Sequence, residues 1–388
     1  MPSFLQFGSI PFIYYPMAYF AILLGGWWSL GGILFVVVTQ VAVDNLTPVD
    51  KRLYHTDAPG YLNLLVYLHI PLGMLLLYLL VWQATPGDML TTGALLSDLF
   101  GTWVMARHTN LDQFGLISCA LLCGFIMSSN TIAAHELMHR LSNRMELFFA
   151  QILLAMNLDT QSAISHVYSH HANVGTDQDA ATARRGETVY GFILRSTIGQ
   201  YRESIEIESK RLHKLGKPVF SLHNKVISGF LLILLLVLVI YLLSDGYGVW
   251  VFFFSGLFSK FMFESVNYIQ HYGLIRVPGT RVEPRHSWDC MSRAGTKTFY
   301  ALARHSHHHA RASLPYWELA PADKQQVLYL KYGYLGEMLI ALIPPLWFTH
   351  TSPQLLEWDA NLACPEEAEL AREANRKSGL HALAAGAA

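Results

Sequence analysis

The sequence predicts an all-α membrane protein, a polytopic bundle of about six transmembrane helices with a cytoplasmic cap that holds a histidine-rich site for two metal ions. Hydrophobic residues make up 52% of the 388 residues and charged residues only 14%, and the mean hydropathy is +0.29. An ordinary soluble domain is less apolar. Several apolar stretches are long enough to cross a bilayer, and nine of the 18 histidines fall into four short clusters.

The apolar stretches set the expected spans. The first, residues 12–43, is too long for one span, and its middle, GGWWSLGG at 25–32, favours a turn with interfacial tryptophans. Two helices are therefore expected to form a hairpin here. An apolar piece at 338–348 is interrupted by two prolines and is expected to lie at the interface or pack on the bundle. The remaining expected spans are 62–82, 114–134, 226–243 and 249–268.

The segment between the fourth and fifth expected spans is basic, and the positive-inside rule places it in the cytoplasm. An even number of spans puts both termini on that side. The histidine clusters follow spans or lie in this segment, so the site is expected at the cytoplasmic mouth of the bundle. One integral domain is expected over 1–373, followed by a disordered tail at 374–388 rich in small residues. The basic residues are Arg184, Arg185, Arg195, Arg202, Lys210, Arg211, Lys214 and Lys217.

The histidines occur in the sequences HELMH, HVYSHH, NYIQHYGL and HSHHH. Neutral imidazole is a strong ligand for iron, zinc or copper, and nine of them are more than one ion needs. Residues four apart share a helical face, so His135 with His139, and His166 with His170, can each present two nitrogens to one side. The predicted metal ligands are His135, His139, His166, His170, His171, His271, His305, His308 and His309.

Three carboxylates, Glu136, Asp179 and Glu264, are candidate hydrogen-bond partners for the ligand imidazoles, since metal-bound histidines usually need an acceptor on the second nitrogen. Asp177 is a further candidate, and a plain salt bridge or helix cap is the alternative for each. His307 is expected to point away from its neighbours. His286 stands alone and is expected to pack or form a hydrogen bond.

Several functional classes are excluded or disfavoured. The four cysteines form no CxxC pair, which argues against an iron–sulfur cluster, a rubredoxin module or a structural zinc site. The net charge of −1 gives no indication of a nucleic-acid partner. HELMH also matches the zinc-protease motif HExxH, but that interpretation needs a site without the other seven histidines.

The motifs HELMHR, the HxxxHH cluster followed by VGTDQDAATARRGE, NYIQHYGL and RHSHHHA resemble the signature set of the integral-membrane alkane and xylene monooxygenases, relatives of the membrane fatty-acid desaturases. The resemblance covers roughly residues 62–375. The HYG element at 271–273 separates these hydroxylases from most desaturases. IPPLWF from Ile343, LLEWD and the acidic segment after it look most like the xylene branch. Ser165 stands where alkane hydroxylases usually have an acidic residue.

This resemblance implies a multi-pass enzyme of the bacterial inner membrane with two non-haem iron ions and O2 as co-substrate. It implies hydroxylation of a terminal or benzylic methyl group on a hydrophobic hydrocarbon that enters from the bilayer lipid. Two electrons would come from a separate ferredoxin, rubredoxin or flavin-containing reductase, because no donor domain is fused. The basic segment could also steer an acidic donor toward the site.

Two alternatives remain. A fatty-acid decarboxylase forming terminal alkenes, or a desaturase, could use the same diiron site and would need a cation for the substrate carboxylate. A metal transporter or bis-histidine haem carrier would place its ligands near the bilayer midplane, whereas these clusters lie at the span ends. The candidate carboxylate-binding cations are Arg107, Arg140, Arg276 and Arg304.

Overall fold

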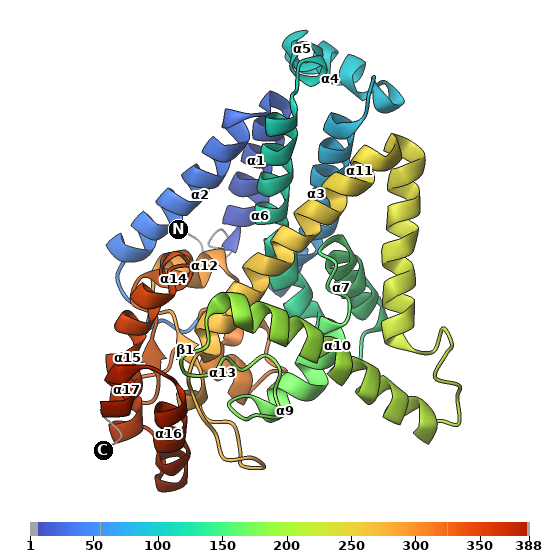
Figure 1. Ribbon diagram of the computed structural model, residues 1–388. Coiled ribbons are helices and arrows are strands. Elements are labelled where there is room, and N and C mark those ends of the chain that lie inside the picture. Colours follow the sequence, from blue (N-terminus) through green and yellow to red (C-terminus); the bar gives the residue numbers. More distant parts are fainter. Residues whose placement is uncertain (1–6, 55, 324, 386–388) are drawn as a thin grey trace. The chain divides into compact units, whose positions relative to one another are not determined.

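The computed structural model describes residues 7–54, 56–323 and 325–385, and these are predominantly helical (Figure 1). The chain divides into two compact units, each built from three separate stretches, where the sequence analysis expects one domain over 1–373. Unit 1 comprises Met1–Thr39, Asp57–Thr160 and Pro218–Met262, and unit 2 comprises Gln40–Thr56, Gln161–Lys217 and Phe263–Ala388.

Unit 1 is made of apolar helices, of which α1, α3 and α6 pack against one another and α7 packs on α3 and α6. The 3-10 turn Met89–Thr91 and a short pair of helices, α4 and α5, join α3 to α6. Two helices, α2 and α11, begin in this unit and end in unit 2. The bounds are a π-helical turn Ile10–Tyr14, α1 Tyr15–Leu24, α2 Trp27–Leu46, α3 Pro59–Ala84, α4 Thr92–Phe100, α5 Trp103–Thr109, α6 Gln113–Met138, α7 Arg144–Met156 and α11 Lys225–His271.

Within the described ranges, four helices are long and apolar enough to cross a membrane, namely α2, α3, α6 and α11. The spans expected at 62–82 and 114–134 are confirmed as α3 and α6. Only 17% of the most apolar part of α11 is buried, and side chains such as Leu235 and Leu242 are exposed. Apolar surface of this extent suits lipid rather than water, and the protein is an integral membrane protein.

The predicted hairpin at 12–43 is present, but its break is shorter than the expected turn at 25–32. Helix α1 ends at Gly25 and Gly26, whose φ angles of +66° and +54° are left-handed, and α2 begins directly at Trp27. Glycine adopts this conformation without a steric penalty. The remainder of the predicted turn belongs to α2, where the missing side chain of Gly32 leaves room for Met17.

The two expected spans 226–243 and 249–268 are present as the two helices that make up α11 (Lys225–His271), which meet at a sharp bend (Figure 1). Asp245 interrupts α11 with φ 58° and ψ −157°, which are not helical values. The predicted boundary between the two spans therefore exists as a kink at one residue. The apolar piece at 338–348 forms the end of α14 (Gly333–Ala341) and the start of α15 (Pro344–Asn361), which begins at a proline.

Unit 2 contains short elements and loops besides α10, α14 and α15. Strands β1 and β2 form a small parallel sheet in which Trp288 pairs with Leu328, and α13 packs beside β1. The other bounds are α8 Ser162–Ser165, a π-helical turn His166–His170, α9 His171–Asn173, α10 Val189–Lys214, 3-10 turns Pro284–His286 and Tyr316–Glu318, β1 Trp288–Asp289, α12 Arg293–Thr298, α13 His305–Ala310, β2 Leu328–Tyr329, α16 Pro365–Lys377 and α17 His381–Ala385.

Most of the predicted disordered tail at 374–388 is helical, since α16 continues to Lys377 and α17 spans His381–Ala385; residues 386–388 lie outside the described part. Helix α16 is amphipathic, with Glu367, Ala371 and Asn375 buried at four-residue spacing. The Asn375 side chain hydrogen-bonds to Arg185 and Asp359. The tail was predicted to be disordered because small residues, mainly alanines, are frequent in it. The buried face of α16 instead packs this helix within unit 2.

Candidate metal centre

The HVYSHH motif lies on one helical segment, 162–173, interrupted by a π-helical turn at His166–His170. In this turn the backbone N–H of His171 donates to the carbonyl of His166, five residues back. Residues five apart therefore share a face, and the Nε2 atoms of His166 and His171 lie 3.0 Å apart. The π-helical turn changes the expected pairing of His166 with His170, because His170 is turned into a different group of imidazoles. Such turns are frequent at functional sites.

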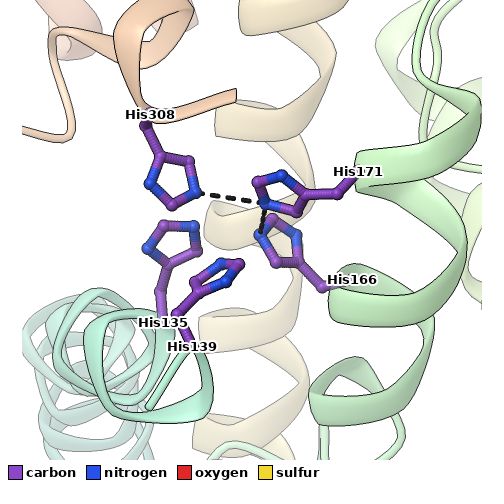
Figure 2. A group of neighbouring side chains, drawn as sticks. All are labelled: His135, His139, His166, His171 and His308. Carbon is purple, nitrogen blue, oxygen red and sulfur yellow. Dashed lines mark hydrogen bonds between the residues drawn. The ribbon is translucent and has the colours of Figure 1, made fainter. Parts of the chain in front are cut away.

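His166, His171 and His308 form one group of imidazoles, the three-histidine cluster. The Nε2 atoms of His308 and His171 are 3.1 Å apart, and one nitrogen from each ring lies within 4.8 Å of the others. Figure 2 shows the three rings turned toward one another from the π-helical segment and from α13. Three nitrogens at this separation can coordinate a single ion.

His170, His271, His305 and His309 form a second group, the four-histidine cluster, and all four are buried. The Nε2 atom of His305 lies 2.9 Å from that of His271 and 3.1 Å from that of His309. The ligand nitrogens of the four rings all lie within 4.8 Å of one another. Residues four apart on α13, His305 and His309, share this cluster as helical spacing predicts.

The two clusters adjoin within unit 2. The rings of His171 and His309 stack with centroids 4.4 Å apart, and those of His170 and His171 are 5.9 Å apart. The HSHHH motif supplies ligands to both clusters, since His308 belongs to the first and its neighbours to the second. Seven predicted ligands are thus brought together in one unit.

The remaining two predicted ligands, His135 and His139, lie at the C-terminal end of α6 in unit 1. Their rings are 5.0 Å apart, as expected for residues four apart on a helix (Figure 2). Glu136 between them forms an ion pair with Arg140 at 2.8 Å. Arg140 also binds Glu146 at 2.8 Å, so Glu136 belongs to a charge network of its own unit.

Asp179 holds His170 in place. Its Oδ2 accepts a hydrogen bond from His170 Nδ1 at 2.8 Å, and its side chain is fully buried. Burial alone would raise the pKa of Asp179, but His170, the Thr182 hydroxyl and the Ala181 backbone N–H together hold it below the usual value. The proton of His170 is therefore on Nδ1. Its buried Nε2 has no hydrogen-bond partner among the residues the structure describes, as expected of a metal ligand.

The other acidic candidates differ from Asp179. Glu264 accepts hydrogen bonds from Ser196 at 2.9 Å and Gln200 at 2.8 Å, which fixes α10 on α11. Asp177 is 94% exposed and lies 3.8 Å from Arg184. Neither of these contacts orients a histidine, whereas the contact of Asp179 with His170 does.

His286 and His307 use their ring nitrogens for protein hydrogen bonds. His286 Nδ1 accepts from the backbone of Glu283 at 2.9 Å, and its Nε2 donates to Glu367 at 2.8 Å. His307 Nδ1 accepts from the backbone N–H of Ala320 at 3.2 Å. His286 also contributes its backbone carbonyl, which accepts from His271 Nδ1 at 3.2 Å.

Asp289 is a residue of the site that sequence reasoning missed. Its carboxylate accepts from the backbone N–H of Ser306 at 2.8 Å and from the Ser306 hydroxyl at 2.7 Å. These bonds fix the start of α13, which carries the HSHHH histidines. Burial raises the pKa of Asp289 to about 7. The sequence did contain an indication of this role. Asp289 is the single acidic residue of the segment HSWDC, and such an isolated acid suggests a buried carboxylate with a hydrogen-bond partner.

The HYG element has a structural explanation. The hydroxyl of Tyr272 accepts a hydrogen bond from the backbone of Gly186 at 3.0 Å, and its ring packs on Trp347. Gly273 adopts a φ of +71° where α11 ends, and a Cβ there would meet Leu355 at 2.8 Å. The Gly273 carbonyl accepts from Arg185 Nε at 2.8 Å. These contacts hold the end of the helix that presents His271.

The donor set suits a transition-metal ion. Burial, together with the neighbouring imidazoles, holds the pKa of His309 well below its ordinary value, so the ring is neutral and able to ligate. His271 and His170 carry their proton on Nδ1 because Nδ1 donates to a carbonyl and a carboxylate. Their Nε2 lone pairs are directed at the imidazole nitrogens of the other rings in the four-histidine cluster. A cation relieves that repulsion, and iron, zinc and copper are the ions that imidazole favours.

Comparisons with known proteins agree with this geometry. Residues 113–335 match the fatty acid desaturase family. The chain is 31% identical over 365 residues to the xylene/toluene monooxygenase hydroxylase component of Pseudomonas putida, covering 92% of this chain and 90% of that protein. It is 32% identical over 304 residues to alkane 1-monooxygenase 1 of Pseudomonas aeruginosa, covering 74% and 77%. The chain therefore belongs to the fatty acid desaturase family, among its xylene and alkane monooxygenases.

Proposed function

We propose that the protein is a membrane non-haem diiron monooxygenase that hydroxylates a terminal or benzylic methyl group of a hydrophobic hydrocarbon. The observation that carries the proposal is the pair of adjoining imidazole clusters in unit 2, with mostly buried rings and a carboxylate behind one of them. A four-histidine and a three-histidine cluster suit two ions rather than one. The first relative's name, a hydroxylase component acting in xylene and toluene oxidation, supports the reaction class.

Each cluster would hold one iron ion. His170, His271, His305 and His309 would bind one, and His166, His171 and His308 the other. We assign His135 and His139 to the second ion as well, because their spacing on α6 presents two nitrogens to one side and three imidazoles leave that ion under-coordinated. When bound, the iron would supply O2 activation and abstraction of hydrogen from an unactivated C–H bond.

The protein's own residues would position the ligands and exclude water. Asp179 and the His286 carbonyl keep the protons of His170 and His271 on Nδ1 and leave Nε2 for the metal. Glu136 and Glu264, the other predicted acids, would act at longer range by fixing α6 and α10. The overall reaction consumes the hydrocarbon, O2, two electrons and two protons, and it yields an alcohol and water.

A hydrocarbon substrate would reach the site from the bilayer. The long apolar helices expose leucine and phenylalanine side chains to the lipid, in which such a substrate concentrates. We propose six crossings, counting α1 with α2 as a hairpin and the two halves of α11 separately. The basic residues between 184 and 217 favour a cytoplasmic site and cytoplasmic termini. The bacterial relatives favour the inner membrane as the location.

Desaturation or decarboxylation of a fatty acid is the second candidate, favoured by the matching family model. Such a substrate needs a cation for its carboxylate. Arg140 is paired with Glu136 and Glu146, and Arg276 donates to the backbone carbonyls of Val174 and Ala172. Arg304 donates to carbonyls of the 50–52 segment. Three of the four candidate cations thus already bind protein groups, which favours an uncharged substrate.

Electrons would come from a separate ferredoxin, rubredoxin or flavin-containing reductase. The basic run is a weak docking surface, because Arg195 and Arg211 are paired with Glu187 and Glu208. A cavity of about 840 Å³ in unit 2 is better placed because it reaches the four-histidine cluster, although its Lys377 and Arg184 are likewise paired, with Glu373 and Asp177. Asp179 and Gly273, which adjoin the four-histidine cluster, line this cavity together with the cations of Arg184, Arg276 and Lys377. We propose that an acidic donor docks over it.

Product analysis tests the reaction. Membranes containing the protein, a broad-specificity ferredoxin and its reductase are supplied with 18O2 and a mixture of xylene, octane and dodecanoic acid. Gas chromatography–mass spectrometry is expected to find an alcohol with one labelled oxygen. Membranes with His271→Ala serve as the matched control and should give none. An unlabelled terminal alkene one carbon shorter than the acid would instead establish a decarboxylase.

A further inference from the structure

The geometry points to Glu367 of α16 as a positioning residue of the four-histidine cluster, acting on His271 through His286. This inference rests on the proposed iron site. It adds a residue that supports the site from α16, which lies outside the region 113–335 that matches the family model. The connection is a chain of hydrogen bonds within unit 2, and each link is short and buried.

The first link joins α16 to His286. Glu367 Oε1 accepts from His286 Nε2 at 2.8 Å. The exposed fraction of the His286 side chain is 0% and that of Glu367 is 1%. Arg285 Nε donates to Glu367 Oε2 at 2.8 Å, and the backbone N–H of Cys364 donates to the same oxygen at 3.1 Å. The carboxylate is thus held on both oxygens and cannot rotate away from His286.

The second link sets the tautomer of His286. Because the backbone N–H of Glu283 donates to Nδ1, the ring proton must be on Nε2, where Glu367 accepts it. With both nitrogens occupied, His286 cannot also bind a metal. The ring instead fastens the 3-10 turn Pro284–His286 to α16 and fixes the direction of the His286 carbonyl.

The third link reaches the cluster. The His286 carbonyl accepts from His271 Nδ1 at 3.2 Å, which leaves His271 Nε2 directed at His305 Nε2 at 2.9 Å. A carbonyl that orients a ligand imidazole is a frequent arrangement in metal sites. Here the carbonyl belongs to a turn with little regular structure of its own, so its direction depends on the His286 ring and on Glu367.

The test measures iron retention in the full chain, purified in detergent and loaded with Fe(II) without oxygen. Iron per chain is measured by mass spectrometry, and its removal by a coloured chelator is followed in time. Glu367→Gln is expected to speed release of about half of the iron by up to about 10-fold, the low end of the effect of losing a direct partner of a ligand, because Glu367 acts through His286. The other half should leave at the wild-type rate.

Two controls separate positioning from general stability. Glu373→Gln on the same helix removes an exposed ion pair with Lys377 and is expected to release iron as the wild type does. Gly124→Ala crowds the contact between α6 and α11, which carry proposed ligands of both ions, so any faster release in this variant should affect both halves of the iron alike. If Glu367→Gln does not fold, Glu367→Asp, which keeps the charge but retracts it by one methylene, replaces it and is expected to release the same half of the iron faster than wild type.

Three results would count against the inference or its premise. Wild-type release rates in folded Glu367→Gln, or in folded Glu367→Asp if only that variant folds, would overturn it. Equal acceleration of both halves of the iron would overturn it too, because that indicates general loosening. Wild-type protein that retains no iron would contradict the proposed function itself, and the two failures are therefore distinguishable.

Discussion

His170 and Asp179, nine residues apart, form a buried pair in which Nδ1 and Oδ2 are separated by 2.8 Å. The bond fixes the imidazole and makes its Nε2 more basic. Replacing Asp179 by Asn keeps an acceptor but removes the negative charge. We expect Asp179→Asn to weaken iron binding by about 10–100-fold, measured as iron per chain after dialysis against graded chelator. Asp177→Asn changes an exposed neighbour and should bind iron normally; equal losses in both variants would contradict a specific role for Asp179.

The HSHHH motif offers a second comparison. His308 lies in the three-histidine cluster, whereas His307 accepts a backbone hydrogen bond from Ala320. We expect His308→Ala to lose iron and hydroxylation. His307→Ala should keep both, with a stability loss of about 1 kcal/mol from the missing hydrogen bond. Metal analysis and thermal unfolding measure the two effects. Iron loss in His307→Ala equal to that in His308→Ala would show that the cluster is assigned wrongly.

Glu367 should make stability depend on pH. His286, Arg285 and the Cys364 N–H outweigh the effect of burial and lower the pKa of Glu367 from 4.5 to about 2. Because the folded pKa is the lower one, the stabilisation is fully present above about pH 4.5 and is lost as the pH falls toward 2. In metal-free protein at pH 7, Glu367→Gln should be less stable by roughly 1–3 kcal/mol.

This difference between Glu367→Gln and wild type should narrow steadily below pH 4.5. Thermal unfolding in detergent at a series of pH values measures it, and the metal-free state removes the effect of histidine protonation on iron. A stability difference that stayed constant from pH 7 to pH 3 would mean that the contacts with His286 and Arg285 do not lower the pKa of Glu367.

Helix packing in unit 1 gives a test of stability rather than of metal binding. A Cβ on Gly124 of α6 would lie 2.3 Å from the carbonyl oxygen of Ser255 on α11. Gly124→Ala should therefore cost about 1–3 kcal/mol of stability. A Cβ on Gly31 of α2 would meet nothing within 4 Å, so Gly31→Ala should stabilise by about 0.5–1 kcal/mol. Thermal midpoints compare the two variants, and a lower midpoint for Gly31→Ala would be unexpected.

Docking of the electron donor is tested by reversing charges. Lys377 lines the cavity that reaches Asp179 and pairs with Glu373, and Lys210 on α10 pairs in the same way with Glu206, so the two variants are matched. Lys377→Glu should lower the donor-coupled rate several-fold and flatten its dependence on salt, with iron content unchanged, because acidic donors are steered by such cations. Lys210→Glu should have little effect. If Lys210→Glu lowered the rate and Lys377→Glu did not, the donor would dock on the basic residues of α10 instead.

The long helices were predictable from sequence because apolarity over 20 residues is a local property. It located α3, α6 and both halves of α11 with their ends near the expected residues. The exact position of the break between α1 and α2 was harder to predict from the sequence, since it depends on left-handed conformations at Gly25 and Gly26. The short helices α4 and α5 gave no clear signal in so apolar a region.

The histidine positions were visible in the sequence, but their division into clusters was not. A regular helix pairs His166 with His170, whereas the π-helical turn pairs His166 with His171. This division depends on tertiary structure, because the segment contributes histidines to two clusters. The link from Glu367 to His286 was also inaccessible, since 81 residues separate the partners and neither belongs to a histidine cluster.

The interleaving of the two units has a consequence for biosynthesis. Stretches of unit 2 precede, separate and follow stretches of unit 1, and its imidazoles come from residues as far apart as 166 and 309. A ribosome has finished all of unit 1 before it reaches His271, so His166, His170 and His171 are synthesised before their partner histidines. Such long sequence separations slow folding. Iron insertion must therefore be late, after membrane insertion of the helices, and cells short of iron should accumulate an inserted but metal-free precursor.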